Sequence, residues 1–178
     1  MKHRLLLSIA LLGLLAGSAH AGTLSDARYR LFYLHPVNGP VRVHSTDPLP
    51  AGSNVAPDNQ WRYDYVVLNK AASPLNAFYA FFNSDNVQRA LHVSGSAPAD
   101  WTVLKLGPIA PNVNYKVRFR TTVQTSKIPT DGELACSEVF TWTGEIVPGP
   151  QNYDAVNDGG SESGVTVEIV DTVGTADA

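Results

Sequence analysis

The sequence predicts an all-β protein that folds as an antiparallel sandwich of two sheets with seven or eight strands. Three observations carry this prediction. Apolar residues come in short runs, and the 14 Gly and 12 Pro fall mostly between these runs, where they favour turns. Several runs alternate apolar and polar residues with the period of two that is typical of a strand with one buried face. Only residues 84–91 have a possible helical pattern, and they are long enough for one or two turns.

The clearest strand covers residues 115–123, where aromatic and aliphatic side chains alternate with Lys, Arg and Thr. Residues 61–68 alternate in a similar way. Residues 75–82 are apolar on both faces except for Asn76, which places that segment in the middle of a sheet. Shorter strands are expected at residues 29–34, 41–44, 102–106, 137–143 and 165–169.

Two turn-rich segments favour a sandwich over a closed barrel. Residues 45–59 are a long Pro/Gly/Asn segment, and sandwiches tolerate long connections between sheets better than barrels do. Residues 144–164 contain Pro148-Gly149-Pro150 and Asp158-Gly159-Gly160. We expect a long loop or an extended crossing there, followed by a short last strand whose apolar face carries Val165, Val167 and Ile169.

Residues 1–21 have the pattern of a secretory signal peptide. They begin with the basic stretch 2–4, continue with a short apolar core at 5–16, and end with the small residues Ala19 and Ala21 of a cleavage site. The apolar core has about a dozen residues, fewer than the roughly 20 that span a bilayer. We therefore expect an exported protein, periplasmic or secreted, with no membrane span after cleavage.

Cleavage changes the size and the charge of the folded protein. Removing 21 of the 178 residues leaves 157, which we expect to form a single domain over residues 22–178. Lys+Arg falls from 13 to 11 against 16 Asp+Glu, so the formal net charge changes from −3 to −5. Such an acidic chain is a poor binder of nucleic acid, and nucleic acid is not an expected partner. The lone Cys136 excludes a domain held by disulfides.

The aromatic strand Trp61–Asn69 is followed by the apolar segment Pro74–Phe82 and later by Phe140–Gly144 and Pro148–Pro150. In this combination, residues 60–170 resemble exported bacterial immunoglobulin-like β-sandwich modules. The resemblance implies an immunoglobulin-like sandwich and no catalytic residue. The Cys…Trp…Cys core of antibody domains is absent from the sequence.

Catalytic signatures are missing from the sequence, including His-Glu-x-x-His, Cys-x-x-Cys and the P-loop. Residues 160–164 come close to a nucleophile elbow, but Glu162 stands where the motif requires Ser, so a flexible loop is expected. His35, His44 and His92 could form a metal site only if the fold brings them together, and isolated histidines at strand ends are usually solvated.

An oxygen-rich cluster suggests calcium as a possible cofactor. Its members are Asp154, Asn157, Asp158 and Glu162. The EF-hand pattern fails because Val156 occupies a position that must supply an oxygen. Asp and Asn also serve turns, and we favour that role over a metal site.

Two groups of side chains are candidates for ligand binding. Lys116, Arg118 and Arg120 form a basic stripe on one face of a strand, and such a stripe can bind an anion or can simply solvate the sheet. Trp101 and Tyr153 lie outside the clear alternating strands, so they are the aromatic residues most available to stack on a sugar. Cys136 shares its parity with Phe140 and Trp142, which predicts a buried thiol.

The sequence therefore predicts a non-catalytic exported β-sandwich that serves as an envelope or extracellular structural or ligand-binding module. An envelope glycan or another envelope protein is the expected kind of partner. Two alternatives stay open. One is an exported hydrolase, in which His44 or His92 would approach a carboxylate and a nucleophile. The other is a subunit that assembles by strand exchange through residues 23–34.

Overall fold

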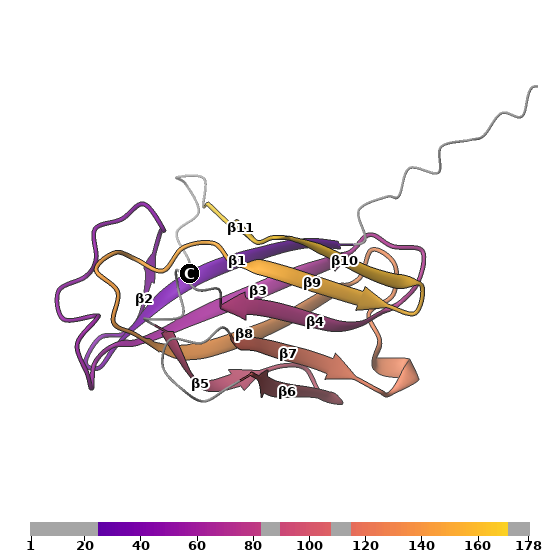
Figure 1. The fold of residues 1–178 in the computed structure, drawn as a ribbon, viewed down its shortest axis with the longest axis horizontal. Helices are drawn as coiled ribbons and strands as arrows, with labels where there is room; N and C mark the ends of the chain where they lie inside the picture. Colours follow the sequence, from indigo (N-terminus) through magenta and orange to yellow (C-terminus); the bar gives the residue numbers. More distant parts are fainter. Residues whose placement is uncertain (1–24, 83–89, 108–114, 171–178) are drawn as a thin grey trace, which may run out of the picture.

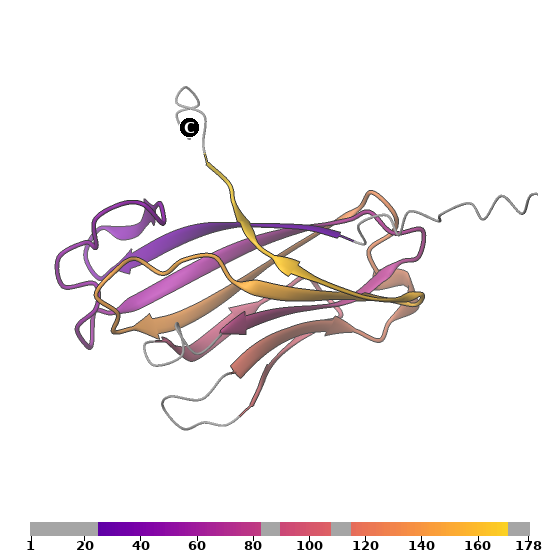
Figure 2. The ribbon, with the colours of Figure 1, turned by 45° about the horizontal axis from the view of Figure 1, so that its top comes forward.

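The computed structural model describes residues 25–82, 90–107 and 115–170 (Figure 1). These residues form two β-sheets that pack face to face, as Figure 2 shows from a second direction. The predicted all-β, two-sheet sandwich is confirmed. The strand pairs are antiparallel except for one, which joins the first and last described strands in parallel. In this part of the chain, no helix is long and apolar enough to cross a membrane.

The first sheet has six strands. Its main order is β11 (Val167–Glu168), β1 (Ser25–His35), β3 (Gln60–Asn69), β8 (Glu133–Trp142) and β5 (Ala90–Ser96), and β2 (Gly39–Val43) also pairs with β1. The second sheet has the order β10 (Gly160–Val165), β9 (Asn152–Asn157), β4 (Leu75–Phe82), β7 (Tyr115–Thr121) and β6 (Trp101–Leu106). A 3-10 turn, η1 (Gln124–Ser126), follows β7.

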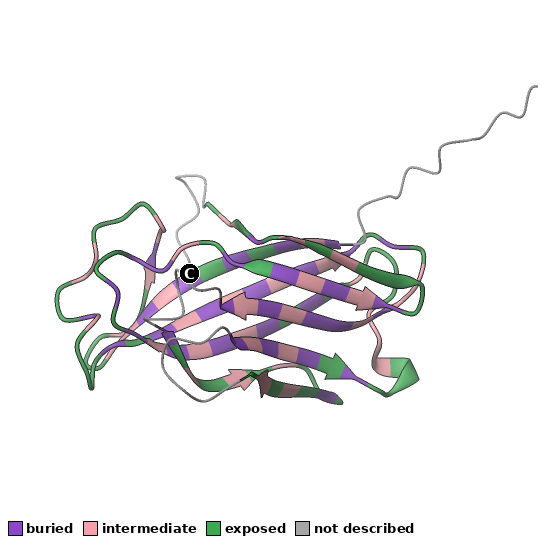
Figure 3. Ribbon diagram, viewed as in Figure 1, coloured by how far each residue is buried: buried purple, intermediate pink, exposed green. Residues whose placement is uncertain are grey.

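Strict alternation decides which side chains enter the space between the sheets. Along β3, β7 and β8, every second residue is buried, and Figure 3 shows the resulting bands of buried and less buried residues. β4 lies in the middle of its sheet between β7 and β9, as its apolar sequence predicts. The lone Cys136 is buried, as predicted, and burial raises the pKa of its thiol well above the usual range.

The described residues contain eleven strands, more than the seven or eight expected. The main reason is that residues 144–164 were expected to form a long loop, and this prediction is wrong for the second half of the segment. There, β9 and β10 form an antiparallel hairpin in which Asn157 pairs with Gly160 around the Asp158-Gly159 turn. The turn residues predicted a loop, but they occupy only the tip of a hairpin. The possible helix at 84–91 lies largely outside the described residues, and Ala90 and Leu91 begin β5.

The expected burial in the last strand is also wrong. Val165 and Val167 are 56% and 59% exposed, whereas Thr166 between them is 1% exposed. The Thr166 hydroxyl donates to the carbonyl of Gln151 and accepts from its amide, both at 2.9 Å. Burial of Thr166 is possible because these two bonds satisfy its hydroxyl, and the two valines consequently face outward.

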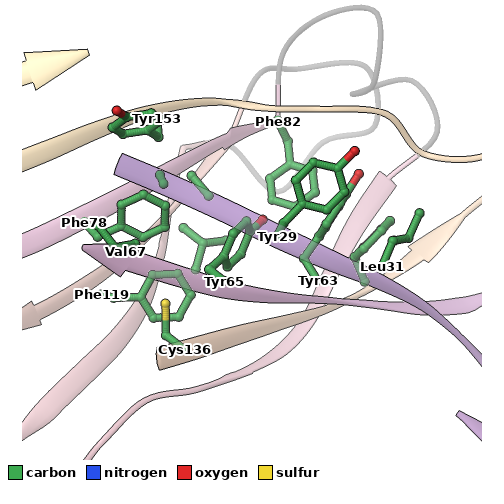
Figure 4. Packing of buried hydrophobic residues seen from close by; sticks show 14 of the residues in the cluster. Tyr29, Leu31, Tyr63, Tyr65, Val67, Phe78, Phe82, Phe119, Cys136 and Tyr153 are labelled. Atoms are coloured by element: carbon green, nitrogen blue, oxygen red, sulfur yellow. The ribbon is translucent and has the colours of Figure 1, made fainter. Parts of the chain in front are cut away.

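The space between the sheets is filled largely by aromatic rings (Figure 4). Tyr63 stacks on Phe140 with ring centroids 5.1 Å apart, and Phe82 stacks on Tyr115 at 4.5 Å. Each such pair adds about 0.5–1.5 kcal/mol beyond the burial of its area. The aromatic residues of β3 and β8, together with Phe78 and Phe82 of β4, thus serve the core.

Polar groups on the buried rings bind loop carbonyls. The three indole nitrogens each donate at 2.8 Å, from Trp61 to Ser53, from Trp101 to Ser126 and from Trp142 to Ile146. The Tyr63 hydroxyl similarly donates to the Gly149 carbonyl at 2.7 Å. These four bonds fasten three connecting segments to the sandwich, because Ile146 and Gly149 lie in the same loop.

The loop after β8 provides a test of this attachment. A Cβ at Gly144 would lie only 2.7 Å from the Trp142 indole nitrogen, so Gly144→Ala must displace either the ring or the loop. We expect Gly144→Ala to lower the free energy of unfolding by about 1–3 kcal/mol, the usual cost of overpacking. Gly149→Ala is the matched control, because nothing lies within 4 Å of its Cβ position. Urea denaturation measures both, and equal stabilities for the two variants would contradict the proposed clash.

Candidate functional site

The outer face of the five-stranded sheet brings basic and aromatic side chains together. The inward residues of β7 are buried, so the predicted stripe of Lys116, Arg118 and Arg120 lies on its outer face. On β4, the neighbouring strand, Tyr79 pairs with Arg118 and Phe81 pairs with Lys116. We call these five residues the cation–aromatic face.

Lys116 joins the two halves of the cation–aromatic face. Its ammonium nitrogen lies 4.9 Å from the centroid of the Tyr79 ring and 5.3 Å from that of Phe81. Each contact is worth about 0.5–1 kcal/mol at a solvent-exposed site. Since a ligand with an anionic group offers the ammonium a competing partner, this arrangement can open when such a ligand binds.

Within the described residues, no ion pair neutralises the positive charge of this face. Among the described residues, Lys116, Arg118 and Arg120 have no carboxylate within ion-pair distance. The outer face of the six-stranded sheet differs, because Arg28 pairs with Asp26 at 2.7 Å and Arg62 pairs with Asp64 at 2.8 Å. The protein is acidic as a whole, yet one sheet face presents a line of cations that have no carboxylate partner in the part of the chain that the structure describes.

A hollow of about 410 Å³ adjoins the aromatic half of this face. Its polar lining comes from Asn152 and Asp154 of β9 and from Ser163 of β10, and Phe81 forms one wall. Asn152 pairs across the sheet with Phe81, and Asp154 pairs with Tyr79. The Ser163 hydroxyl donates to Asp154, so this carboxylate is held at the sheet surface. The hollow therefore combines an apolar ring with hydrogen-bonding groups.

The two aromatic residues expected to bind a ligand lie elsewhere. The expectation that Trp101 and Tyr153 lie outside strands is wrong, because they are in β6 and β9 and are only 8% and 6% exposed. Their polar groups are used internally, since Trp101 donates to Ser126 and the Tyr153 hydroxyl donates to the Ser25 carbonyl at 3.2 Å. Tyr79 and Phe81, which sequence reasoning missed, are partly exposed. So is Phe32 on the other sheet, where the Arg62 guanidinium lies 4.8 Å from its ring centroid.

A signal for Tyr79 and Phe81 is present in the sequence. They are two residues apart in a strand that is apolar on both faces, so one pair of rings had to face away from the core. Periodicity states which residues share a face, but it does not state which face the other sheet covers.

The four residues of the expected calcium cluster are not brought together. Asp154 points outward, whereas Glu162 pairs with the inward residue Ala155 and accepts a hydrogen bond from the Ser25 amide at 3.1 Å. Asn157 accepts from the Gly159 amide at 2.8 Å within the hairpin turn. Asp158 forms an ion pair with Lys127 at 2.8 Å, which lowers the pKa of its carboxyl. In the part of the chain that the structure describes, no group of three His, Cys, Asp or Glu residues is placed to hold a metal.

The three histidines lie in separate environments. His35 accepts hydrogen bonds from the Val37 and Asn38 amides, both at 3.1 Å, and so stabilises its own turn. His44 lies 3.3 Å from Glu168, and His92 lies 2.6 Å from Glu138. The histidines therefore do not form a joint site.

Neither His–carboxylate pair has the order of a catalytic triad, in which His stands between the carboxylate and the nucleophile. Beside His44, the Ser45 hydroxyl donates to Glu168 at 2.5 Å, so both residues contact the same carboxylate. Residues 160–164, which come close to a nucleophile elbow in sequence, form strand β10.

Glu138 is the most unusual ionisable group of the described residues. Its side chain is fully buried at the edge where β5 and β8 meet, and its Oε2 atom has no hydrogen-bond partner there. Burial raises the pKa of its carboxyl to about 7, although His92 and Lys105 act in the opposite direction. Tyr115 is affected in turn, because its own burial and the nearby Glu138 raise the pKa of its hydroxyl.

The raised pKa of Glu138 makes stability depend on pH. A carboxyl that holds its proton more tightly in the folded state stabilises the protein below the unfolded pKa of 4.5, and this contribution is lost as the pH rises through about 7. The full shift corresponds to about 3 kcal/mol. We expect the free energy of unfolding to fall between pH 5 and pH 8 in the wild type and to change less in Glu138→Gln. Denaturation curves at each pH test this.

The control is Glu133→Gln, which removes an exposed carboxylate from the same strand. This variant should keep the wild-type dependence on pH. Parallel curves for wild type and Glu138→Gln would show that Glu138 does not titrate in this range.

Comparison with known proteins gives no family assignment. No protein-family model matches the sequence, and no curated protein matches it significantly.

Proposed function

We propose that the protein is a non-catalytic, exported module of the immunoglobulin-like β-sandwich type, and that it binds an anionic polysaccharide of the cell envelope. The cation–aromatic face is the binding surface. The observation that carries the proposal is the line of Lys116, Arg118 and Arg120 beside two aromatic rings, with no carboxylate partner in the described chain.

The geometry of a strand suits a linear polyanion. Outward side chains on β7 are two residues apart, which spaces the cations at roughly 7 Å along one straight line. A polysaccharide with regularly repeated charges can follow such a line. Sugar rings also have apolar faces, and Tyr79 and Phe81 offer apolar surface next to the cations.

Export rests on the sequence pattern of residues 1–21 and on the resemblance to exported immunoglobulin-like modules. Nucleic acid is not among the proposed partners because the chain has a net negative charge. Although the β7 stripe is basic, the whole chain is acidic, and a long nucleic acid would also meet the rest of that acidic surface.

The two alternative functions receive less support. A hydrolase of the expected kind needs a nucleophile that is hydrogen-bonded to a histidine. Among the described residues, neither His–carboxylate pair has such a nucleophile beside its histidine. Strand exchange needs a detached segment or an open groove at residues 23–34. From Ser25 onward this segment is β1, which pairs with β3 on one side and with β2 and β11 on the other.

Removal of the three cations tests the proposed function. The triple variant Lys116→Ala, Arg118→Ala, Arg120→Ala should bind polygalacturonate roughly 3- to 150-fold more weakly than wild type, because exposed ion pairs contribute about 0.2–1 kcal/mol each. Isothermal titration calorimetry at low salt measures the affinity. Wild-type binding should weaken as salt is added.

A second triple variant, Arg28→Ala, Arg30→Ala, Arg62→Ala, is the matched control. It removes the same charge from the outer face of the other sheet and should bind as wild type does. Equal losses in both variants would indicate a general charge effect. Failure of the wild type to bind any anionic glycan would refute the proposal.

A further inference from the structure

An acidic side chain lies next to the aromatic centre of the cation–aromatic face. Asp154 on β9 flanks Tyr79 on the side opposite to Arg118, and Asn152 flanks Phe81 on the side opposite to Lys116. The face is therefore divided. Cations line one side of the two rings, and hydrogen-bonding groups line the other.

The hollow occupies the hydrogen-bonding side. Its volume of about 410 Å³ lies within the usual range of small-ligand sites. Gly164 contributes backbone to its lining, and the missing side chain there makes room for the Tyr153 ring, whose atoms would lie 2.7–2.8 Å from a Cβ at this position. Asp154 can accept hydrogen bonds, Asn152 can donate and accept them, and Phe81 supplies the apolar wall.

We propose that this hollow binds one uronic acid residue of the polysaccharide. The sugar ring lies against Phe81, its hydroxyls donate to Asp154 and bond with Asn152, and its carboxylate binds Lys116. This subsite rests on the proposed function, because it adds a ligand class to the same face.

The charges on both sides of the rings select this class of sugar. Asp154 repels a densely sulfated chain but accepts hydrogen bonds from free hydroxyls. A neutral sugar leaves Lys116 without an anionic partner, so the ammonium stays over Tyr79 and Phe81 and covers them. A sugar with one carboxylate and several free hydroxyls satisfies both sides. Its carboxylate also draws Lys116 off the rings and exposes the surface on which the sugar stacks.

Four polymers separate these contributions: polygalacturonate, its fully methyl-esterified form, dextran sulfate and neutral dextran. At 150 mM salt, we expect wild type to bind polygalacturonate at least tenfold more tightly than the ester, and more tightly than dextran sulfate per charge. Lys116→Ala should remove the preference for polygalacturonate over the ester. Phe81→Ala should weaken binding of both galacturonate polymers.

Asp154→Asn gives the most specific test, because it removes the repelling charge and changes the side chain very little. We expect it to raise the affinity for dextran sulfate at least threefold and to lower the affinity for polygalacturonate. Asp58→Asn, in an exposed loop outside this face, makes the same charge change and should alter neither affinity. Unchanged melting temperatures show that the variants are folded.

The outcomes distinguish the subsite from the function on which it rests. If wild type prefers dextran sulfate and Asp154→Asn changes nothing, the uronate subsite is refuted while the polyanion-binding face stands. If none of the four polymers binds, both proposals fail. Binding to phosphatidylglycerol vesicles in place of the polymers would also refute both and would identify a lipid surface as the partner.

Discussion

The structure depends on the burial of aromatic rings that carry polar groups. Trp61, Trp142 and Tyr63 place large rings between the sheets, and each ring has a donor that is costly to bury without a partner. Carbonyl groups of loops supply the partners, so the loops are attached to the core that they surround. The same requirement explains why Pro- and Gly-rich segments of this protein follow fixed courses, since a loop that accepts a hydrogen bond from a buried indole must pass close to it.

The core also determines the binding face, because the strands that fill the interior carry that face on their other side. Phe78 of β4 pairs with Phe119 of β7, and both rings pack inside. The next pair in the ladder, Tyr79 and Arg118, lies on the outside. Hydrogen bonds of the sheet ladder and packing of the inner rings therefore fix the spacing of the outer groups. A polymer that binds there meets side chains on a rigid support, which reduces the ordering cost of binding.

The sequence predicted features that depend on alternation within one strand. The all-β class, the stripe on β7, the central position of β4 and the burial of Cys136 all follow from which residues share a face. Features that depend on pairing between strands were not predictable in this way. Asp158 and Gly159 form a tight hairpin because β9 and β10 pair. Trp101 is buried because β6 pairs with β7 in a register that turns its ring toward the core. The polar neighbours of Phe81 come from β9, which is about 70 residues away in the chain, and no local pattern reports that contact.

The position of Lys116 over Tyr79 and Phe81 has a further consequence for the free protein. Two neighbouring aromatic rings on an open sheet would form an exposed hydrophobic patch, and such patches promote association between copies of a protein. A charged lysine above them makes that association unfavourable, because another copy would have to desolvate the ammonium before it reached the rings. The residue that recognises the ligand in our proposal thus also protects its own surface from aggregation until a ligand arrives.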